Sequence, residues 1–158
     1  MARVLIVGCG CRGQELARAL RAAGHAVRGT TRDRERFPAI EAAGAEPYLG
    51  DPDRIGTLMD ALTGVTVLVW LFGDVPDADL HGGRLRMLWE KLVDTPVRGV
   101  VYEAAGPLDA AVYARGREVA AAAHATWMIP LQVLEDDPSD HETWQRGAAV
   151  AVTSLLRG

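Results

Sequence analysis

Short apolar runs rich in branched residues alternate along the whole sequence with stretches whose apolar residues recur at helical spacing. Runs of this length suit the strands of a buried sheet, and the stripes suit helices that cover it. We expect strands at 3–7, 26–30, 45–49, 65–71, 97–102 and 126–129. The two clearest helical stripes are Ile55, Leu58, Met59, Leu62 and Leu85, Leu88, Trp89, Leu92. This repeated strand-helix unit predicts a parallel sheet with helices on both faces, because right-handed crossovers place them there.

The expected fold class is α/β, with a doubly wound, six-stranded parallel sheet of the Rossmann type in the order 3-2-1-4-5-6. We expect one three-layer domain that spans residues 1–158, since no linker or change of composition divides the chain. The run "VTVLVWL" at 65–71 is almost continuously apolar, which is typical of a central strand. This strand order predicts a ligand crevice at the carboxyl ends of strands 1 and 4.

Two local patterns predict where helices begin. Asp51 precedes Pro52, which favours a helix start directly after the third strand. Ser139 is followed three residues later by Glu142, the spacing of a capping box, so we expect the last helix to begin there. The apolar stripe of that last helix is Trp144, Ala148, Ala151 and Leu155.

Composition narrows the range of partners. The formal net charge of −4 offers no basic excess for nucleic acid. Every apolar run falls short of the ~20 residues of a membrane span, and the first run is too short for a signal peptide. The two cysteines, Cys9 and Cys11, are one residue apart and cannot form the disulfide framework of a secreted protein. We therefore expect a cytoplasmic protein with neither a nucleic-acid nor a membrane partner.

The segment "VLIVGCGCRGQELARAL" carries a glycine loop between the first strand and the first helix. In a G-x-G-x-x-G loop, the first glycine permits a sharp turn, the second lets a pyrophosphate approach the backbone, and the third lets helix and strand pack closely. The positive end of the helix then favours phosphate. The candidate cofactor-binding residues here are Gly8, Gly10, Cys11, Arg12 and Gly13, with Arg12 as a charge near the pyrophosphate.

The end of the second strand, in "VRGTTRDRERF", bears on which cofactor would bind. An acidic residue is expected there for NAD, but the sequence has Thr30, Thr31 and Arg32, with no carboxylate before Asp33. Hydroxyls and a guanidinium suit a 2′-phosphate, which predicts NADP rather than NAD. The alternative is that Arg32 and Arg34 are solvated residues at the start of the next helix.

The segments "VGCGCRGQELARAL", "GHAVRGTTRD", "GAEPYLGDPD" and "LTGVTVLVWLFG" together resemble an atypical member of the extended short-chain dehydrogenase/epimerase superfamily. The resemblance runs from Arg3 to about Pro130. It implies that Asp51 contacts the adenine, a role that can coexist with capping a helix. It also implies that Phe72 and Gly73 line the adenosine and ribose side of the cofactor.

Catalysis in that superfamily uses a tyrosine, a lysine four residues later and a serine near the end of the fifth strand. The corresponding segment, "VVYEAAGPLDAAVYARGREV", has Tyr113 and Arg117 at this spacing, but it lacks the lysine and the serine. Glu103 lies at the tip of the strand, where it could act as a general base or bind the nicotinamide ribose. The alternative is that Tyr113 packs the helix and Arg117 is a surface charge.

Three functions remain open at this point. The first is an NADP(H)-binding protein that lacks the family's serine-tyrosine-lysine catalysis and acts as a sensor or regulator. The second is a small NADP-dependent oxidoreductase or epimerase-like enzyme that uses Tyr113, Arg117 and Glu103. The third is a minimal domain that binds another nucleotide or none.

The sequence ends one helix after the sixth expected strand, whereas extended members build much of their substrate pocket from a later region. A pocket for an unknown small-molecule substrate would then come from the loops 72–83 and 103–110 or from a second subunit. Trp127 and Trp144 could serve such a homo-oligomer interface or belong to the core. His81, near the crevice, is a candidate for substrate contact.

The cysteines offer little for metal binding, because His25, His81, His124 and His141 do not fall at ligand spacing from them. We expect no metal site. A thiol at a helix N-terminus beside Arg12 should have a lowered pKa, which would suit a redox role. The alternative is that Cys9 and Cys11 are small residues that fill a tight turn.

Overall fold

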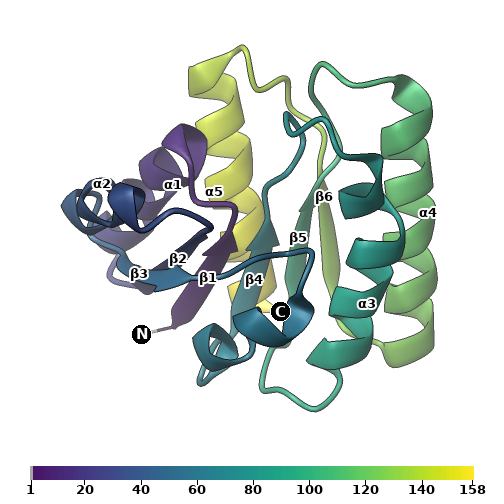
Figure 1. Cartoon of the computed structure of the whole chain (residues 1–158), viewed down its shortest axis with the longest axis horizontal. Helices are drawn as coiled ribbons and strands as arrows, with labels where there is room; N and C mark the ends of the chain where they lie inside the picture. The colour runs from purple at the N-terminus through teal and green to yellow at the C-terminus, as the bar shows by residue number, and fades with distance from the viewer. Residues whose placement is uncertain (1) are drawn as a thin grey trace.

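The computed structural model describes residues 2–158 and contains one parallel, six-stranded sheet in the order β3-β2-β1-β4-β5-β6 (Figure 1). The strands are β1 (Arg3–Val7), β2 (Ala26–Thr31), β3 (Glu46–Leu49), β4 (Val67–Trp70), β5 (Val100–Glu103) and β6 (Leu131–Leu134). This confirms the predicted fold class and the predicted strand order.

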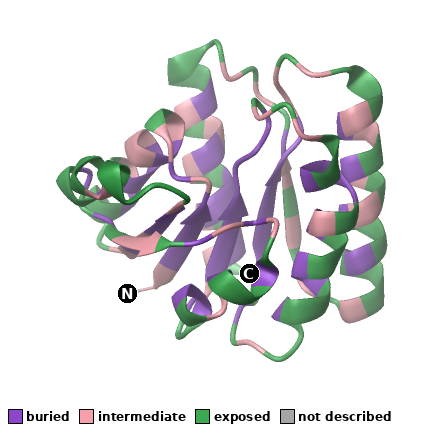
Figure 2. Ribbon diagram, viewed as in Figure 1, coloured by how far each residue is buried: buried purple, intermediate pink, exposed green. Residues whose placement is uncertain are grey.

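Helices cover both faces of the sheet. The helices α1 (Cys11–Ala22), α2 (Phe37–Ala42) and α5 (His141–Arg157) lie on one face, and α3 (Gly83–Leu92) and α4 (Ala110–Trp127) lie on the other (Figure 1). Alternate residues of β1 supply the two cores: Val4 and Ile6 pack toward α1 and α5, and Leu5 and Val7 pack toward α3. β4 and β5 are buried along their whole length, and β1 is buried from Val4 onward (Figure 2). Each fully buried aliphatic side chain contributes about 1.5–3 kcal/mol, so these two cores hold the sheet.

The register of the central strands decides which loops meet. Val7 pairs with Trp70, so the residues that follow β1 lie beside those that follow β4. Trp70 pairs with Tyr102, which brings the end of β5 to the same place. The glycine loop therefore lies next to Leu71 and Phe72 at the carboxyl edge of the sheet.

The prediction of an α-helix after the third strand is wrong. The structure has two short 3₁₀ helices there, Ile55–Leu58 and Asp60–Leu62. The Thr57 hydroxyl bonds to the backbone oxygens of Asp51 and Arg54, and this competes with regular helix formation. Asp51 caps a local turn instead, and its carboxylate accepts from the backbone N–H of Asp53 at 2.9 Å.

The sixth strand also differs from the prediction. Residues 126 and 127 still belong to α4: the Thr126 hydroxyl bonds back to the Ala122 carbonyl, and Met128 adopts a left-handed cap with φ 58°. The strand begins only at Leu131. Branched and aromatic residues raised the strand propensity of 126–129, but the continuing helix overrode it.

The last helix begins one residue later than its capping pattern predicts. Asp140, and not Ser139, caps α5 by accepting from the backbone N–H of Thr143 at 3.3 Å. The predicted stripe of Trp144, Ala148, Ala151 and Leu155 is buried, so Trp144 belongs to the core. None of the helices within residues 2–158 combines the length and hydrophobicity needed to cross a bilayer.

Candidate functional site

The glycine loop has three different steric environments. Gly8 adopts φ +87°, and a Cβ there would lie 2.6 Å from the Leu71 carbonyl oxygen. A Cβ at Gly13 would lie 3.1 Å from the Ile6 side chain, so this position brings α1 close to β1. A Cβ at Gly10 would have no heavy atom of the described chain within 4 Å. The loop is therefore tight at both ends and open in the middle.

The N-terminus of α1 faces this open space. Gly10 is the N-cap, and within residues 2–158 no side chain caps the helix. The first N–H groups of a helix have no partners inside it and carry a partial positive charge, so they favour an anion. The loop is fixed to β2, because Thr30 accepts from the N–H of Gly8 at 3.2 Å and of Cys9 at 2.9 Å.

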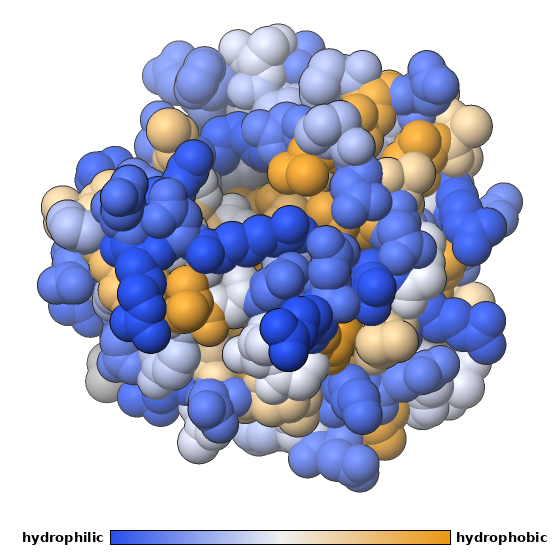
Figure 3. All heavy atoms as spheres, viewed as in Figure 1, coloured by the Kyte–Doolittle hydropathy of each residue, from blue (hydrophilic) through white to orange (hydrophobic). Residues whose placement is uncertain are grey.

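A cavity of about 590 Å³ opens in front of α1. Figure 3 shows a hollow in this face, bordered mainly by hydrophilic residues with hydrophobic residues on one side. Three segments line the cavity: Gly8 to Gly13, the end of β2 with Thr30, Thr31, Arg32, Asp33 and Arg36, and the loop after β4 with Leu71, Phe72, Asp74 and Val75. The glycine loop, the end of β2 and the loop after β4 thus meet at the carboxyl edge of the sheet, where the crevice was predicted.

Most of the predicted cofactor-binding residues lie in this lining: Gly8, Gly10, Cys11, Arg12, Gly13, Thr30, Thr31, Arg32 and Phe72. Two predicted residues lie outside it. Asp51 is turned toward the Asp53 backbone and Arg32. Gly73 is buried beside the end of β5, where a Cβ would lie 2.2 Å from the Ala105 carbonyl oxygen.

Two arginines from the segment that follows β2 line the cavity, Arg32 and Arg36. The half-exposed Arg32 lies 3.4 Å from the Asp51 carboxylate and 3.3 Å from that of Asp53. Arg36 was missed by the sequence reasoning, although its place four residues after Arg32 was the available signal. Arg34, by contrast, lies over the Phe37 ring at 5.8 Å. Arg32 and Arg36 therefore line the cavity, whereas Arg34 does not.

Arg12 reaches across the sheet edge into a group that we call the Arg12 cluster, formed by Arg12, Asp74, Glu103 and Trp144. Its Nη1 bonds to the Glu103 carboxylate and its Nη2 lies 3.0 Å from Asp74 Oδ1. The guanidinium lies 5.0 Å from the centre of the Trp144 ring. Although burial opposes the charge, these carboxylates raise the pKa of Arg12 above its ordinary value. The cation is therefore committed to protein partners.

Glu103 is fully buried and does not line the cavity. Its Oε1 accepts from the Gly73 N–H at 2.9 Å, and its Oε2 accepts from the Trp144 indole at 2.8 Å as well as from Arg12. Both carboxylate oxygens are therefore occupied. This arrangement holds the ends of β4, β5 and α5 together and does not present a base to the crevice.

Tyr113 is buried on α4. Its hydroxyl donates to the Gly73 carbonyl at 2.7 Å and accepts from the Leu108 N–H at 2.9 Å. Burial raises the pKa of Tyr113 above its ordinary value. Arg117 is half-buried further along the helix, where its charge acts on Tyr102. The structure therefore places Tyr113, Glu103 and Arg117 on neighbouring elements, with the first two engaged by backbone groups.

His81 is also buried and is not open to a substrate. Its Nε2 lies 3.0 Å from the Phe72 carbonyl and its Nδ1 lies 2.6 Å from the Tyr102 hydroxyl. The carbonyl requires an N–H at Nε2, which assigns the neutral ring that accepts from Tyr102. Burial lowers the pKa of His81.

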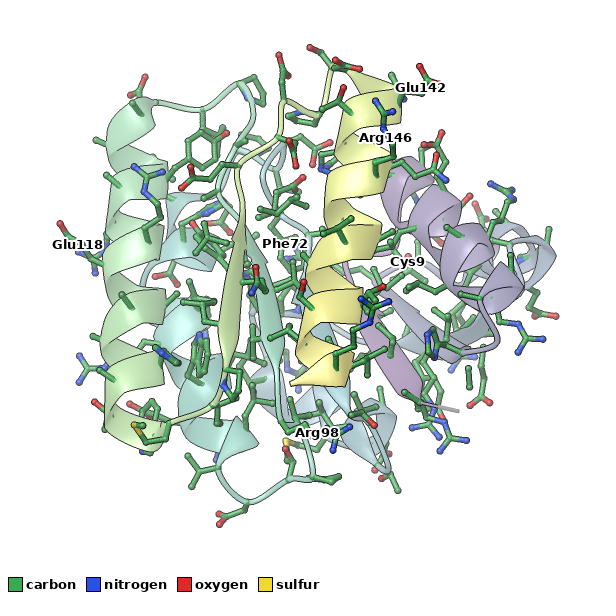
Figure 4. The ribbon with its side chains drawn as sticks, turned by 180° about the vertical axis from the view of Figure 1, so that it is seen from behind. Cys9, Phe72, Arg98, Glu118, Glu142 and Arg146 are labelled. Carbon is green, nitrogen blue, oxygen red and sulfur yellow. The ribbon has the colours of Figure 1, made fainter. Side chains whose placement is uncertain are left out.

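The two cysteines have different environments. Cys9 is buried on the face of the sheet that α1 and α5 cover (Figure 4), and burial raises its pKa to about 12, against the expected lowering. A Cβ on Gly29 would lie 2.7 Å from the Cys9 sulfur, so this thiol fills space between strand and helix. Cys11 is exposed and lines the cavity. No group of three metal-binding side chains occurs in the described chain.

A scan of protein-family models finds no match to this sequence. A search of curated proteins also finds none. Solved structures do match. The Citrobacter sp. triphenylmethane reductase complexed with NADP(H) is 22% identical with a TM-score of 0.68, over 85% of this chain and 49% of that one. The Bacillus cereus UDP-glucuronic acid 4-epimerase in complex with NAD is 16% identical with a TM-score of 0.63, over 84% and 55%.

A putative NAD-dependent epimerase/dehydratase from Bacillus halodurans is 15% identical with a TM-score of 0.71, over 87% of this chain and 71% of that one. These likenesses show a Rossmann fold in this chain, which is the fold that its resemblance to the extended short-chain dehydrogenases implies. This Rossmann fold spans about half the length of the reductase and of the epimerase.

Proposed function

We propose that this Rossmann domain binds NADP(H) without the conventional catalysis of the extended short-chain dehydrogenases, as a sensor or regulatory protein. One observation carries the proposal: a single cavity joins the uncapped N-terminus of α1 to the two arginines at the end of β2. The first feature suits a pyrophosphate and the second suits a 2′-phosphate. The neighbours solved with NADP(H) and NAD support a dinucleotide ligand of this class.

The acidic residue near the end of β2 supports NADP over NAD. Asp33 lines the cavity, but its carboxylate accepts from the Glu35 N–H at 2.9 Å and caps a short 3₁₀ helix, Arg34–Arg36. Recognition of an unphosphorylated ribose would need a carboxylate aimed at the 2′-hydroxyl. Thr31, Arg32 and Arg36 instead supply a hydroxyl and two cations.

The residues present fit this cofactor in defined places. Gly10 leaves the backbone open for close approach, and the N–H groups of Cys11, Arg12 and Gly13 begin α1. NADP(H), when bound, supplies a nicotinamide ring able to exchange hydride. Leu71 and Phe72 lie beside the glycine loop and supply an apolar part of the cavity lining.

The engagement of Tyr113 supports binding without the family's catalysis. Its hydroxyl already donates to one backbone group and accepts from another. Position 117 holds arginine in place of lysine, and the strand end reads Glu103-Ala104-Ala105 without a serine. The Arg12 cluster further occupies Glu103. A protein that keeps the cofactor loop but engages the catalytic positions structurally suits a sensor.

The test is titration calorimetry of the full chain with NADP⁺ and with NAD⁺. We expect NADP⁺ to bind more tightly, and Arg32→Ala to weaken NADP⁺ by about tenfold or more, because a charge-assisted bond to a phosphate contributes 1.5–3 kcal/mol. Arg34→Ala is the matched control and should leave both affinities unchanged. The assignment would be contradicted if NADP⁺ did not bind at millimolar concentration, or if Arg32→Ala lost the same factor of affinity for NADP⁺ and for NAD⁺.

A panel of carbonyl compounds with NADPH separates the sensor from the enzyme. We expect no turnover above the uncatalysed background. Turnover that is lost in a folded Tyr113→Phe variant would instead establish the alternative, a small NADP-dependent oxidoreductase.

A further inference from the structure

The lining of the cavity comes from one side of the domain. A Rossmann fold consists of two mononucleotide-binding halves, which meet at the change of strand order between β1 and β4. The first half supplies the glycine loop and the end of β2, and the second supplies only the loop from Leu71 to Val75. Within residues 2–158, nothing beyond Val75 lines the cavity. The carboxyl ends of β5 and β6 are thus outside it.

The Arg12 cluster lies between the glycine loop and the carboxyl ends of β4 and β5, where the second half of the fold would contribute its part of a binding site. Arg12 leaves the cofactor loop on the first half and bonds to Asp74 after β4 and to Glu103 at the tip of β5. The side chain of Arg12 is 13% exposed. Trp144 from α5 packs against the guanidinium and donates to Glu103, so the ion pair is held from the side of α5 as well.

The closure is firmly held. Glu103 is fully buried and has three donors, from Arg12, the Gly73 backbone and the Trp144 indole. A buried carboxylate that loses its cation is costly, so a ligand could not displace Arg12 without a large penalty. The β4 loop is held as well, since Tyr113 and His81 bond to the carbonyls of Gly73 and Phe72.

We propose that the site recognises the adenosine 2′,5′-bisphosphate half of NADP(H), and that the Arg12 cluster excludes the nicotinamide half from specific contact. The inference rests on the proposed function and narrows it. The ligand class becomes adenine nucleotides that carry a 5′-phosphate and a 2′-phosphate. The nicotinamide half of a bound dinucleotide remains in solvent and adds nothing to affinity.

Calorimetry on the full chain with four ligands tests this: adenosine 2′,5′-bisphosphate, NADP⁺, NADPH and nicotinamide mononucleotide. We expect the first three to bind with dissociation constants within about threefold of one another, a difference below 1 kcal/mol. Nicotinamide mononucleotide should not bind at millimolar concentration. NADP⁺ binding about tenfold or more tightly than the bisphosphate would overturn this inference and leave the proposed function in place. No binding by any of the first three would overturn both.

A double variant tests the role of the cluster directly. Arg12→Met with Glu103→Gln removes both charges together, so no buried ion is left unpaired. We expect this variant to bind NADP⁺ about tenfold more tightly than the bisphosphate, as the second half opens. A ratio equal to that of the unmodified protein would count against the cluster as the barrier. Arg86→Met with Glu90→Gln, which removes an exposed ion pair on α3 outside the cavity lining, is the matched control and should keep the original ratio.

Discussion

The hydroxyl of Tyr113 donates a hydrogen bond to the backbone oxygen of Gly73 at 2.7 Å and ties α4 to the loop that follows β4. Two other buried side chains hold the same loop, since Glu103 accepts from the Gly73 N–H and His81 bonds to the Phe72 carbonyl. The loop forms one wall of the cavity. Tyr113 thus helps to hold one wall of the cavity in place.

Replacing Tyr113 by phenylalanine should lower the free energy of unfolding by about 1–3 kcal/mol, because it leaves the Gly73 carbonyl and the Leu108 N–H without their partner. Urea denaturation measures the change. Tyr48→Phe, at a half-buried residue of β3, is the control and should change stability by less than about 0.5 kcal/mol. Equal effects of the two substitutions would show that the Tyr113 hydroxyl has no supporting role.

The glycine loop offers a contrast between folding and binding. Gly8→Ala should lower stability by about 2 kcal/mol or more, because of its positive φ and the collision with the Leu71 carbonyl. Gly10→Ala should leave the melting temperature unchanged, since φ is −85° and a Cβ meets no heavy atom of the described chain within 4 Å. It should nevertheless weaken NADP⁺, because the methyl group would project into the cavity. Unchanged NADP⁺ affinity in Gly10→Ala would contradict the placement of the ligand.

Alkylation separates the two cysteines. Cys11 is exposed in the cavity lining, whereas Cys9 is buried and has a pKa of about 12. Iodoacetamide at neutral pH should therefore modify Cys11 alone in the native protein, and both residues after denaturation. Saturating NADP⁺ should slow the modification of Cys11. Peptide mass spectrometry identifies the modified residue, and rapid labelling of Cys9 in the native state would show that the turn opens.

Stability should depend on pH through His81, whose pKa is lowered by burial from an ordinary value of 6.5. Above pH 6.5 the ring is neutral in both states. Below pH 6.5 the imidazole is protonated in the unfolded chain but stays neutral in the folded chain, so the free energy of unfolding falls as the pH falls. The slope from this one group is at most about 1.4 kcal/mol per pH unit. It ends once the pH drops below the lowered pKa of the folded state.

Urea titrations between pH 5 and pH 8 measure this slope. A folded His81→Asn variant should lose most of it, whereas His124→Gln, at an exposed residue near the end of α4, should keep it. The same slope in His81→Asn and in the unmodified protein would assign the pH dependence to other groups.

The sequence determined the architecture because its signals are local. An apolar run such as "VTVLVWL" favours a buried strand through its own residues. The alternation of strands and helices then restricts the sheet to a few topologies. The glycine loop was recognisable for the same reason, since its backbone demands lie within six consecutive residues. Local signals gave wrong predictions in two places. The Thr57 hydroxyl bonds to the backbone where the third helix was expected, and α4 continues to Trp127, into the range predicted for the sixth strand.

Only the tertiary structure decided what the polar residues do. Arg12, Glu103 and Trp144 are far apart in the sequence, and no spacing rule predicts that they meet. Strand register brings the ends of β1, β4 and β5 together. Glu103, which by its position could act as a base, is therefore buried and accepts hydrogen bonds from three donors. Secondary structure follows from neighbours along the chain, but the availability of a carboxylate or a phenol depends on the donors that folding places around it.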